Sequence, residues 1–227
     1  MPQGSEVSGT QDDKRTLIIY KEIRMFTVLI GSVARGEQKD NSDIDIVRIN
    51  HEYEVDRQNE WPLGPINYID YSISDFHKLY NKGSLFIYHI LNDGILLSGC
   101  CDSWKEYTTK FQFIDTYLEE LNNIRDVLYE VFNTSIYGGT FLSFYSNIFT
   151  LIKNFSIFYL AHNSIFDFNK ESAFLKVFGK KYFYILNTSY NIFERNEAYL
   201  LNSIDIKSEL IAKEIINYLY KKLEELI

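Results

Sequence analysis

The chain has few of the residues that cross-link or interrupt a fold. Its two cysteines, Cys100 and Cys101, are adjacent, so it has no disulfide framework of the kind that stabilises small secreted domains. This favours a reducing, cytoplasmic compartment. The chain has only three prolines and eleven glycines, which fits a protein with much helix.

Long apolar runs are also missing. We expect no transmembrane span, because no run of about 18 uncharged apolar residues occurs. The nearest candidate, residues 141–161, is interrupted by Asn147, Lys153 and Asn154. The first 15 residues are polar and lack the apolar segment of a signal peptide, so we expect a disordered tail over residues 1–15.

An excess of basic charge is absent as well. Lys and Arg number 23 against 31 Asp and Glu, which gives a net charge of −8. Proteins that bind extended duplexes neutralise many phosphates with Lys and Arg, so we expect no extended duplex nucleic-acid binding. A hydrophobic content of 46% supports a real core in one large domain or two small ones.

Residues 31–47, GSVARGEQKDNSDIDIV, are the most informative segment, and they follow the apolar run 26–30. Alternate side chains of a strand share a face, so Asp43 and Asp45 are predicted to project together. Two carboxylates on one face repel each other unless a cation lies between them, and Mg²⁺ prefers oxygen ligands of this kind. Gly31 permits close backbone approach to phosphate, which Ser32 and Arg35 can also contact.

Each half of this segment is weak evidence alone. A GS turn is a plain loop in most proteins, and an isolated D-x-D is most often a solvated turn or edge strand. Their combination at this spacing, with an apolar strand on each side, favours a phosphate and metal site.

The string G-S-x-A-R-G followed by S-D-I-D resembles the signature of the DNA polymerase β-type nucleotidyltransferase superfamily, in its minimal and kanamycin nucleotidyltransferase-like branch. The resemblance is near complete over residues 31–47 and persists to about residue 99. It implies an α+β fold in which a small mixed β-sheet, a polymerase β-like palm, precedes an α-helical bundle. We therefore expect a nucleotidyltransferase domain over residues 16–103 and a helical domain over residues 104–227.

The resemblance also implies roles for individual residues. The family carries a third acid on a later strand, and Asp70, in the Ile- and Tyr-rich run 66–73, is the candidate; a solvent-facing edge-strand Asp is the alternative. Asp56 and Asp75 are weaker candidates. Asp43, Asp45 and Asp70 would be the catalytic residues. They would hold two Mg²⁺ ions, with Mn²⁺ as the alternative. The expected nucleotide-binding residues are Gly31, Ser32, Arg35, Gly36 and Ser42.

The segment after this strand is expected to complete the domain. Ser74 is predicted to cap a short helix, residues 84–91 a second helix, and residues 95–97 a short strand. The spacing of His77 and His89 fits no metal site, so both are expected to be structural.

The second half is predicted to be helical. Apolar spacing predicts helices over residues 117–132, 139–162, 172–187, 191–202 and 208–226. The second of these is so aromatic that it is expected to be buried or to form a homo-oligomer surface. Lys153 and Asn154 in that helix could contact nucleotide or acceptor, although snorkelling of Lys153 to the surface is the favoured alternative.

The expected activity is Mg²⁺-dependent transfer of a nucleoside monophosphate from an NTP, with ATP favoured, to an acceptor hydroxyl. The resemblance points to a partner protein as the acceptor, as in toxin–antitoxin pairs. Three alternatives stay open: synthesis of an oligonucleotide or nucleotide signal in antiviral defence, an aminoglycoside-type small molecule as acceptor, and a non-catalytic antitoxin-like binding module.

Overall fold

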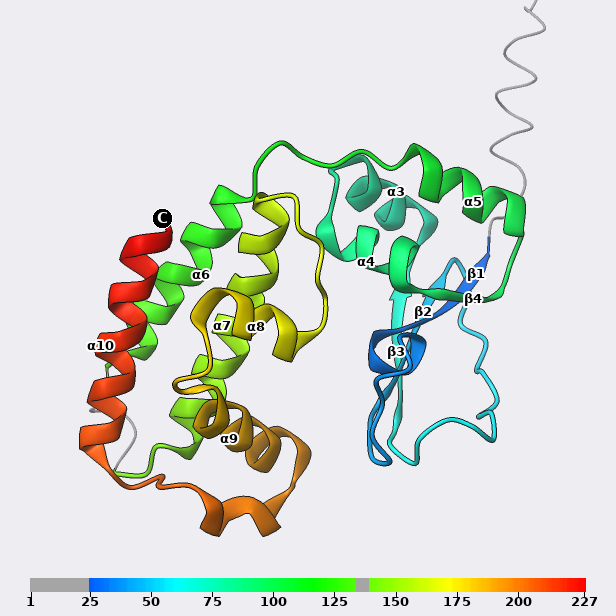
Figure 1. The fold of residues 1–227 in the computed structure, drawn as a ribbon. Coiled ribbons are helices and arrows are strands. Elements are labelled where there is room, and N and C mark those ends of the chain that lie inside the picture. The colour runs from blue at the N-terminus through cyan, green and yellow to red at the C-terminus, as the bar shows by residue number, and fades with distance from the viewer. Residues whose placement is uncertain (1–24, 134–138) are drawn as a thin grey trace, which may run out of the picture. The chain divides into compact units, whose positions relative to one another are not determined.

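The structure is a computed structural model that describes residues 25–133 and 139–227. The tail expected over residues 1–15 lies outside these residues. The chain is an α+β protein with two compact units, one ending at Phe113 and the other beginning at Ile114 (Figure 1). The coarse fold class predicted from the sequence is therefore confirmed.

The first unit contains a mixed four-stranded sheet with the order β3-β2-β1-β4. β1 is antiparallel to both β2 and β4, whereas β2 and β3 are parallel. All four strands were predicted from apolar runs. Their bounds are β1 Phe26–Ile30, β2 Ile44–Ile49, β3 Ile66–Tyr71 and β4 Ile95–Ser98.

Different parts of the chain pack on the two faces of the sheet. On the face that we call the helix face, Val28, Val47 and Ile49 pack against helices that follow β3. On the opposite face, which we call the loop face, Leu29 and Ile46 pack against residues of the β2–β3 loop. Alternation along each strand assigns every strand residue to one of these faces. The covering helices are α3 Ile73–Asn81, α4 Leu85–Asp93 and α5 Cys101–Lys110.

Helix α5 was not predicted as an element. Its Trp104 and Tyr107 are buried in the helix-face core, and the Trp104 ring lies 5.1 Å from that of Phe26. This burial explains why the first unit extends to Phe113 rather than to the expected boundary at residue 103.

The N-cap of helix α3 (Ile73–Asn81) lies two residues earlier than predicted. Ser72, not Ser74, is the N-cap, and its Oγ accepts a hydrogen bond from the Asp75 backbone N–H at 3.0 Å. Asp75 lies in the first turn, as predicted, and its carboxylate accepts the Ser72 hydroxyl proton at 2.7 Å. Asp75 therefore belongs to a helix cap.

The second unit is a set of helices around one aromatic core. α7 packs against α6, α8 and α9, and its Phe144, Tyr145, Phe149 and Phe155 are fully buried. The predicted helix over residues 172–187 is broken at Gly179, which has φ +71°. The bounds are α6 Leu118–Val131, α7 Leu142–His162, α8 Lys170–Phe178, α9 Phe183–Arg195, the 3₁₀ helix η2 Ala198–Ser203 and α10 Glu209–Leu226.

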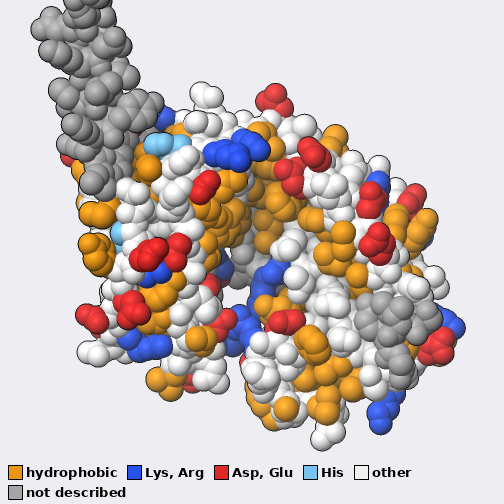
Figure 2. Space-filling model, turned by 180° about the vertical axis from the view of Figure 1, so that it is seen from behind, with side chains coloured by type: hydrophobic (Ala, Val, Ile, Leu, Met, Phe, Trp, Pro, Cys, Tyr) orange, Lys and Arg blue, Asp and Glu red, His pale blue; other side chains and the backbone are white. Residues whose placement is uncertain are grey.

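The surface carries charges of both signs. On the face seen in Figure 2, acidic and basic side chains are interspersed with hydrophobic ones. Within the part of the chain that the structure describes, no helix is both long enough and apolar enough to span a bilayer.

Candidate functional site

The turn after β1 lies directly against an acid of β2. Ile30, the last residue of β1, is in register with Asp45. The next residue, Gly31, has φ +76°, a conformation that L side chains rarely adopt. A Cβ on Gly31 would lie 2.9 Å from Asp45 Oδ2. A side chain here would therefore displace the carboxylate, so glycine brings the turn and the acid together.

The turn continues into the one-turn helix α2 (Gly31–Ala34). Its N-cap residue, Ile30, supplies no side-chain hydrogen bond, and the first N–H groups of any helix have no intrahelical partner. These N–H groups and the Ser32 hydroxyl are suited to an anion. Arg35 follows as the C-cap, and its Nε donates to Glu37 Oε2 at 2.8 Å, so its charge is shared with an acid.

Asp43 and Asp45 flank the start of β2. Both are partly buried, whereas the intervening Ile44 is completely buried. By strand alternation Asp45 belongs to the helix face with Val47, at the end of the sheet where the β1–α2 turn lies. Asp45 and the turn thus lie together at one end of the sheet, and Asp43 lies one residue before β2.

Asp70 does not join this pair. It is in register with Arg48 on the loop face, and Arg48 holds it by two hydrogen bonds: Nε to Oδ1 at 2.6 Å and Nη2 to Oδ2 at 2.8 Å. The hydrogen bonds from Arg48 hold the pKa of Asp70 below its usual value. The prediction that Asp70 completes a three-acid site therefore needs correction, because strand register places it on the opposite face from Asp45.

Arg48 has further contacts that fix this arrangement. The buried guanidinium also donates from Nη1 to the Glu52 carbonyl at 2.7 Å and to the Tyr53 carbonyl at 3.1 Å. It lies 4.1 Å from the centroid of the Tyr68 ring. Asp70 is thus part of an ion pair that ties the β2–β3 loop to the sheet.

The residue of β3 that does lie beside the acid pair is Asn67. It is in register with Asp45, and its Nδ2 donates to Asp45 Oδ1 at 3.3 Å. Sequence reasoning missed Asn67 because it sought an acid. The sequence did contain a signal for Asn67. It lies three residues before Asp70, and side chains three positions apart on a strand lie on opposite faces.

Ser42 and Gly36 were also predicted to bind nucleotide, and both lie in the segment between α2 and β2. Ser42 is buried, and its Oγ accepts the Lys39 backbone N–H at 2.8 Å, so the hydroxyl already serves the turn before β2. Gly36 is exposed, with φ +69°. Of the predicted nucleotide-binding residues, Gly31 is therefore the one that the structure places against Asp45, and Ser32 and Arg35 follow it in α2 and at its C-cap.

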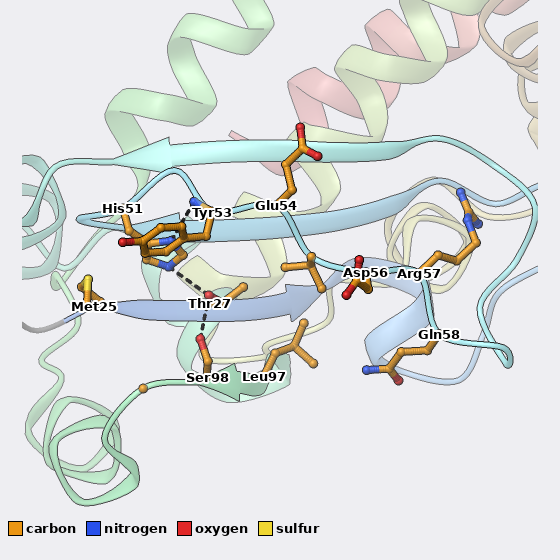
Figure 3. A pocket seen from close by; sticks show the side chains of 12 residues that line it. Met25, Thr27, His51, Tyr53, Glu54, Asp56, Arg57, Gln58, Leu97 and Ser98 are labelled. Carbon is orange, nitrogen blue, oxygen red and sulfur yellow. Dashed lines mark hydrogen bonds between the residues drawn. The ribbon is translucent and has the colours of Figure 1, made fainter.

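A cavity of about 710 Å³ lies elsewhere in this unit, on the loop face (Figure 3). In it, Thr27 Oγ1 lies 2.9 Å from His51 Nε2 and accepts the Ser98 hydroxyl at 2.9 Å. Thr27 is in register with Arg48, so this cavity is on the opposite face from Asp45. Asp56 lines it, and this weaker third-acid candidate is a loop-face residue.

The two histidines that were expected to be structural are packed within the unit. His77 Nε2 lies 2.6 Å from the Tyr107 hydroxyl. His89 is buried, its Nδ1 lies 3.2 Å from Asp93 Oδ2, and burial lowers its pKa.

The donor set at the acid pair fits a magnesium ion that is shared with a ligand. It comprises the Asp45 carboxylate, whose Oδ1 accepts from Asn67 Nδ2, and the Asp43 carboxylate two residues earlier in the chain. Mg²⁺ is commonly held by one or two carboxylates together with substrate phosphates. Over residues 25–133 and 139–227 there is no cluster of three or more His, Cys, Asp or Glu side chains suited to a metal.

Comparisons with known proteins add no identification: no family model matches the chain, and no curated protein matches it in sequence.

Proposed function

We propose that the first unit binds a nucleoside triphosphate together with Mg²⁺ and transfers its nucleoside monophosphate to an acceptor hydroxyl. The observation that carries this proposal is the contact between the Gly31 turn and Asp45, where a Cβ would come within 2.9 Å of the carboxylate. The turn that we propose binds phosphate therefore lies against one of the acids that we propose bind metal. The mixed sheet and the motif over residues 31–47 support a polymerase β-like palm.

Each residue has a role that follows from its atoms. The N–H groups at the start of α2 and the Ser32 hydroxyl donate to the β- and γ-phosphate oxygens. Asp43 and Asp45 hold Mg²⁺, which when bound neutralises phosphate charge. Arg35 adds a positive charge at the end of α2, moderated by Glu37.

The reaction forms one bond and breaks another. The acceptor oxygen attacks the α-phosphorus, the bond from that phosphorus to the bridging oxygen breaks, and pyrophosphate leaves. The hydroxyl proton passes to solvent or to a nearby carboxylate. The residues of the site contribute by positioning the reactants and by stabilising the developing charge.

The acceptor proposed is a hydroxyl side chain of a partner protein, with ATP as the favoured nucleotide. This choice rests on the motif's resemblance to minimal nucleotidyltransferases. Incorporation into an oligonucleotide or nucleotide signal, or transfer to a small-molecule hydroxyl, would use the same acid pair and would differ only in the product.

A second candidate function is nucleotide binding without transfer, and Asn67 favours it. An amide stands beside Asp45 where a carboxylate would complete a third acidic ligand, and Asp70 is held by Arg48 on the other face. An amide oxygen is a weaker ligand for a hard cation than a carboxylate, and it cannot accept the acceptor proton at neutral pH.

One experiment separates the two candidates. The protein is incubated with each α-³²P-labelled NTP and Mg²⁺, alone and with the protein encoded by an adjacent gene, and binding is measured in parallel. Label on a protein supports transfer to a partner, and an oligonucleotide ladder or small labelled product supports the alternative acceptors. Nucleotide binding that needs Asp43 and Asp45, without any labelled product, supports the binding module. Absence of Mg²⁺-dependent nucleotide binding would refute both.

A further inference from the structure

The segment that joins the two units, residues 111–117, forms neither helix nor strand. It follows α5 and precedes α6, and the division between the units falls inside it, after Phe113. The segment contains no glycine and no proline. Where it can bend therefore depends on which of its residues are packed against a unit.

The first half of the segment is packed within the first unit. The Phe111 ring lies 5.4 Å from the Tyr80 ring of α3 and 5.7 Å from the Tyr88 ring of α4. The Phe113 ring lies 4.6 Å from the Tyr88 ring and 5.3 Å from the Phe111 ring. Tilted and edge-to-face ring pairs at these distances stabilise beyond the burial of apolar area, so Phe111 and Phe113 move with the first unit.

The end of the segment is held within the second unit. The Tyr117 side chain is buried, and its ring lies 5.8 Å from the Phe158 ring of α7. The Tyr117 backbone N–H donates to Nδ1 of His162, also in α7, at 3.4 Å. Thr116 Oγ1 accepts the Leu118 backbone N–H at 3.2 Å, at the start of α6. Thr116 and Tyr117 therefore move with the second unit.

Ile114 and Asp115 lie between these two anchors. Over residues 25–133 and 139–227, neither of them forms a hydrogen bond, an ion pair or a ring contact. Asp115 is exposed and Ile114 is partly buried. Each residue has two soft backbone dihedrals, so the pair can redirect the chain without breaking either anchor.

We infer that Ile114 and Asp115 form a hinge on which the two units turn as separate bodies. Hinges are commonly a few loop residues that absorb a change in backbone dihedrals while the packed elements on each side stay intact. The ring contacts of Phe113 and the buried Tyr117 confine the bending to the two residues between them. The hinge does not depend on the function proposed for the acid pair.

Double electron–electron resonance between nitroxide labels on the full chain measures this motion. Cys100→Ser and Cys101→Ser first remove the two exposed native thiols, so that labels attach only at introduced cysteines. Lys82→Cys and Lys221→Cys then place one label on each unit, at exposed side chains.

Two further label pairs are controls that lie within one unit each. Lys82→Cys with Lys105→Cys joins α3 and α5 of the first unit, and Tyr184→Cys with Lys221→Cys joins α9 and α10 of the second. All four side chains are exposed. We expect the distance distribution across the units to be at least about twice as wide as those within them.

Asp115→Pro should narrow the distribution across the units, because proline fixes φ at its own position and restricts the preceding residue to extended conformations. Asp115→Ala is the matched control. It removes the same carboxylate but leaves the backbone dihedrals free, so its distribution should equal that of the unsubstituted chain. The Asp115 backbone N–H forms no hydrogen bond in the described part of the chain, so Asp115→Pro should leave the within-unit distances unchanged.

Phe113→Ala should widen the distribution across the units, because it removes the ring contact with Tyr88 and lengthens the segment that is free to bend. Gln112→Ala, at the exposed neighbouring residue, should not widen it. The hinge is overturned if the distribution across the units is as narrow as those within them. Equal widths in Asp115→Pro and Asp115→Ala would also overturn it, because the bending would then occur at other residues.

Discussion

Asn67 lies directly across from Asp45 in the parallel pair β2–β3 and donates a hydrogen bond to its carboxylate at 3.3 Å. The motif GSVARGEQKDNSDIDIV supplies two acids at this end of the sheet, and the neighbouring strand supplies an amide. A neutral side chain, and not a third carboxylate, therefore lies beside Asp45.

Replacement of Asn67 by Asp tests this dependence. A third carboxylate beside Asp45 should tighten binding of Mg²⁺ or Mn²⁺ by about tenfold, because affinity for hard cations rises with the number of charged ligands. Titration of Mn²⁺ followed by electron paramagnetic resonance measures the change. Asn67→Ala is the control and should not tighten binding; equal affinity of Asn67→Asp and wild type would show that residue 67 is not a ligand.

Gly31→Ala should weaken Mg²⁺-dependent nucleotide binding by about tenfold or more, because its Cβ would crowd Asp45 Oδ2 and the positive φ costs about 1–2 kcal/mol. Gly36→Ala is the matched control. It has a similar φ of +69°, but an added Cβ there meets nothing within 4 Å. Fluorescence titration with a labelled ATP analogue distinguishes them, and equal losses in both variants would mean that backbone strain alone is responsible.

Asp70→Asn should lower the free energy of unfolding by about 1 kcal/mol, since it weakens a charge-assisted pair in which the carboxylate is half exposed. Nucleotide binding should be retained. Asp45→Asn should have the reverse profile, with loss of Mg²⁺-dependent nucleotide binding and little change in stability. Urea unfolding and nucleotide titration of both variants make the comparison, and loss of binding in Asp70→Asn would restore the three-acid prediction.

The Arg48–Asp70 pair should also leave a signature in the pH dependence of stability. Hydrogen bonds from Arg48 lower the pKa of folded Asp70, so its stabilising contribution is complete above the unfolded pKa of about 3.9. The contribution is lost as pH falls through the lower folded pKa. The difference in unfolding free energy between wild type and Asp70→Asn should therefore be constant at neutral pH and shrink below about pH 4. A difference that persists undiminished at pH 2 would contradict the shift.

Tyr145→Phe should stabilise the second unit by about 1 kcal/mol, because it removes a buried hydroxyl that has no partner in the described part of the chain. Burial raises the pKa of Tyr145 to about 12. The control is Tyr129→Phe, whose lost hydroxyl donates to Glu224 at 2.8 Å, so this change should destabilise. Thermal unfolding measures both, and destabilisation by Tyr145→Phe would reveal a partner for its hydroxyl.

Local patterns were sufficient for much of the fold. The apolar runs predicted all four strands, and the aromatic periodicity of residues 139–162 predicted the buried helix α7. Helix α5 was missed because its sequence CDSWKEYTTK is mostly polar, with Trp104 and Tyr107 as its buried anchors. The break at Gly179 was missed because apolar residues continue on both sides of it.

For the site, the spacing of Gly31 and Asp45 along one connected segment was enough to predict that they lie together, because a strand, a turn and a second strand are local structure. Alternation along β3 puts Asp70 on the same face as Tyr68, whatever the pairing of the strand. Only tertiary structure decided whether that face of β3 is on the same side of the sheet as Asp45. Register between β2 and β3 depends on packing between segments about 20 residues apart, and a shift of one residue exchanges the faces. That nonlocal choice puts Asn67 beside the acid pair and gives Asp70 to Arg48.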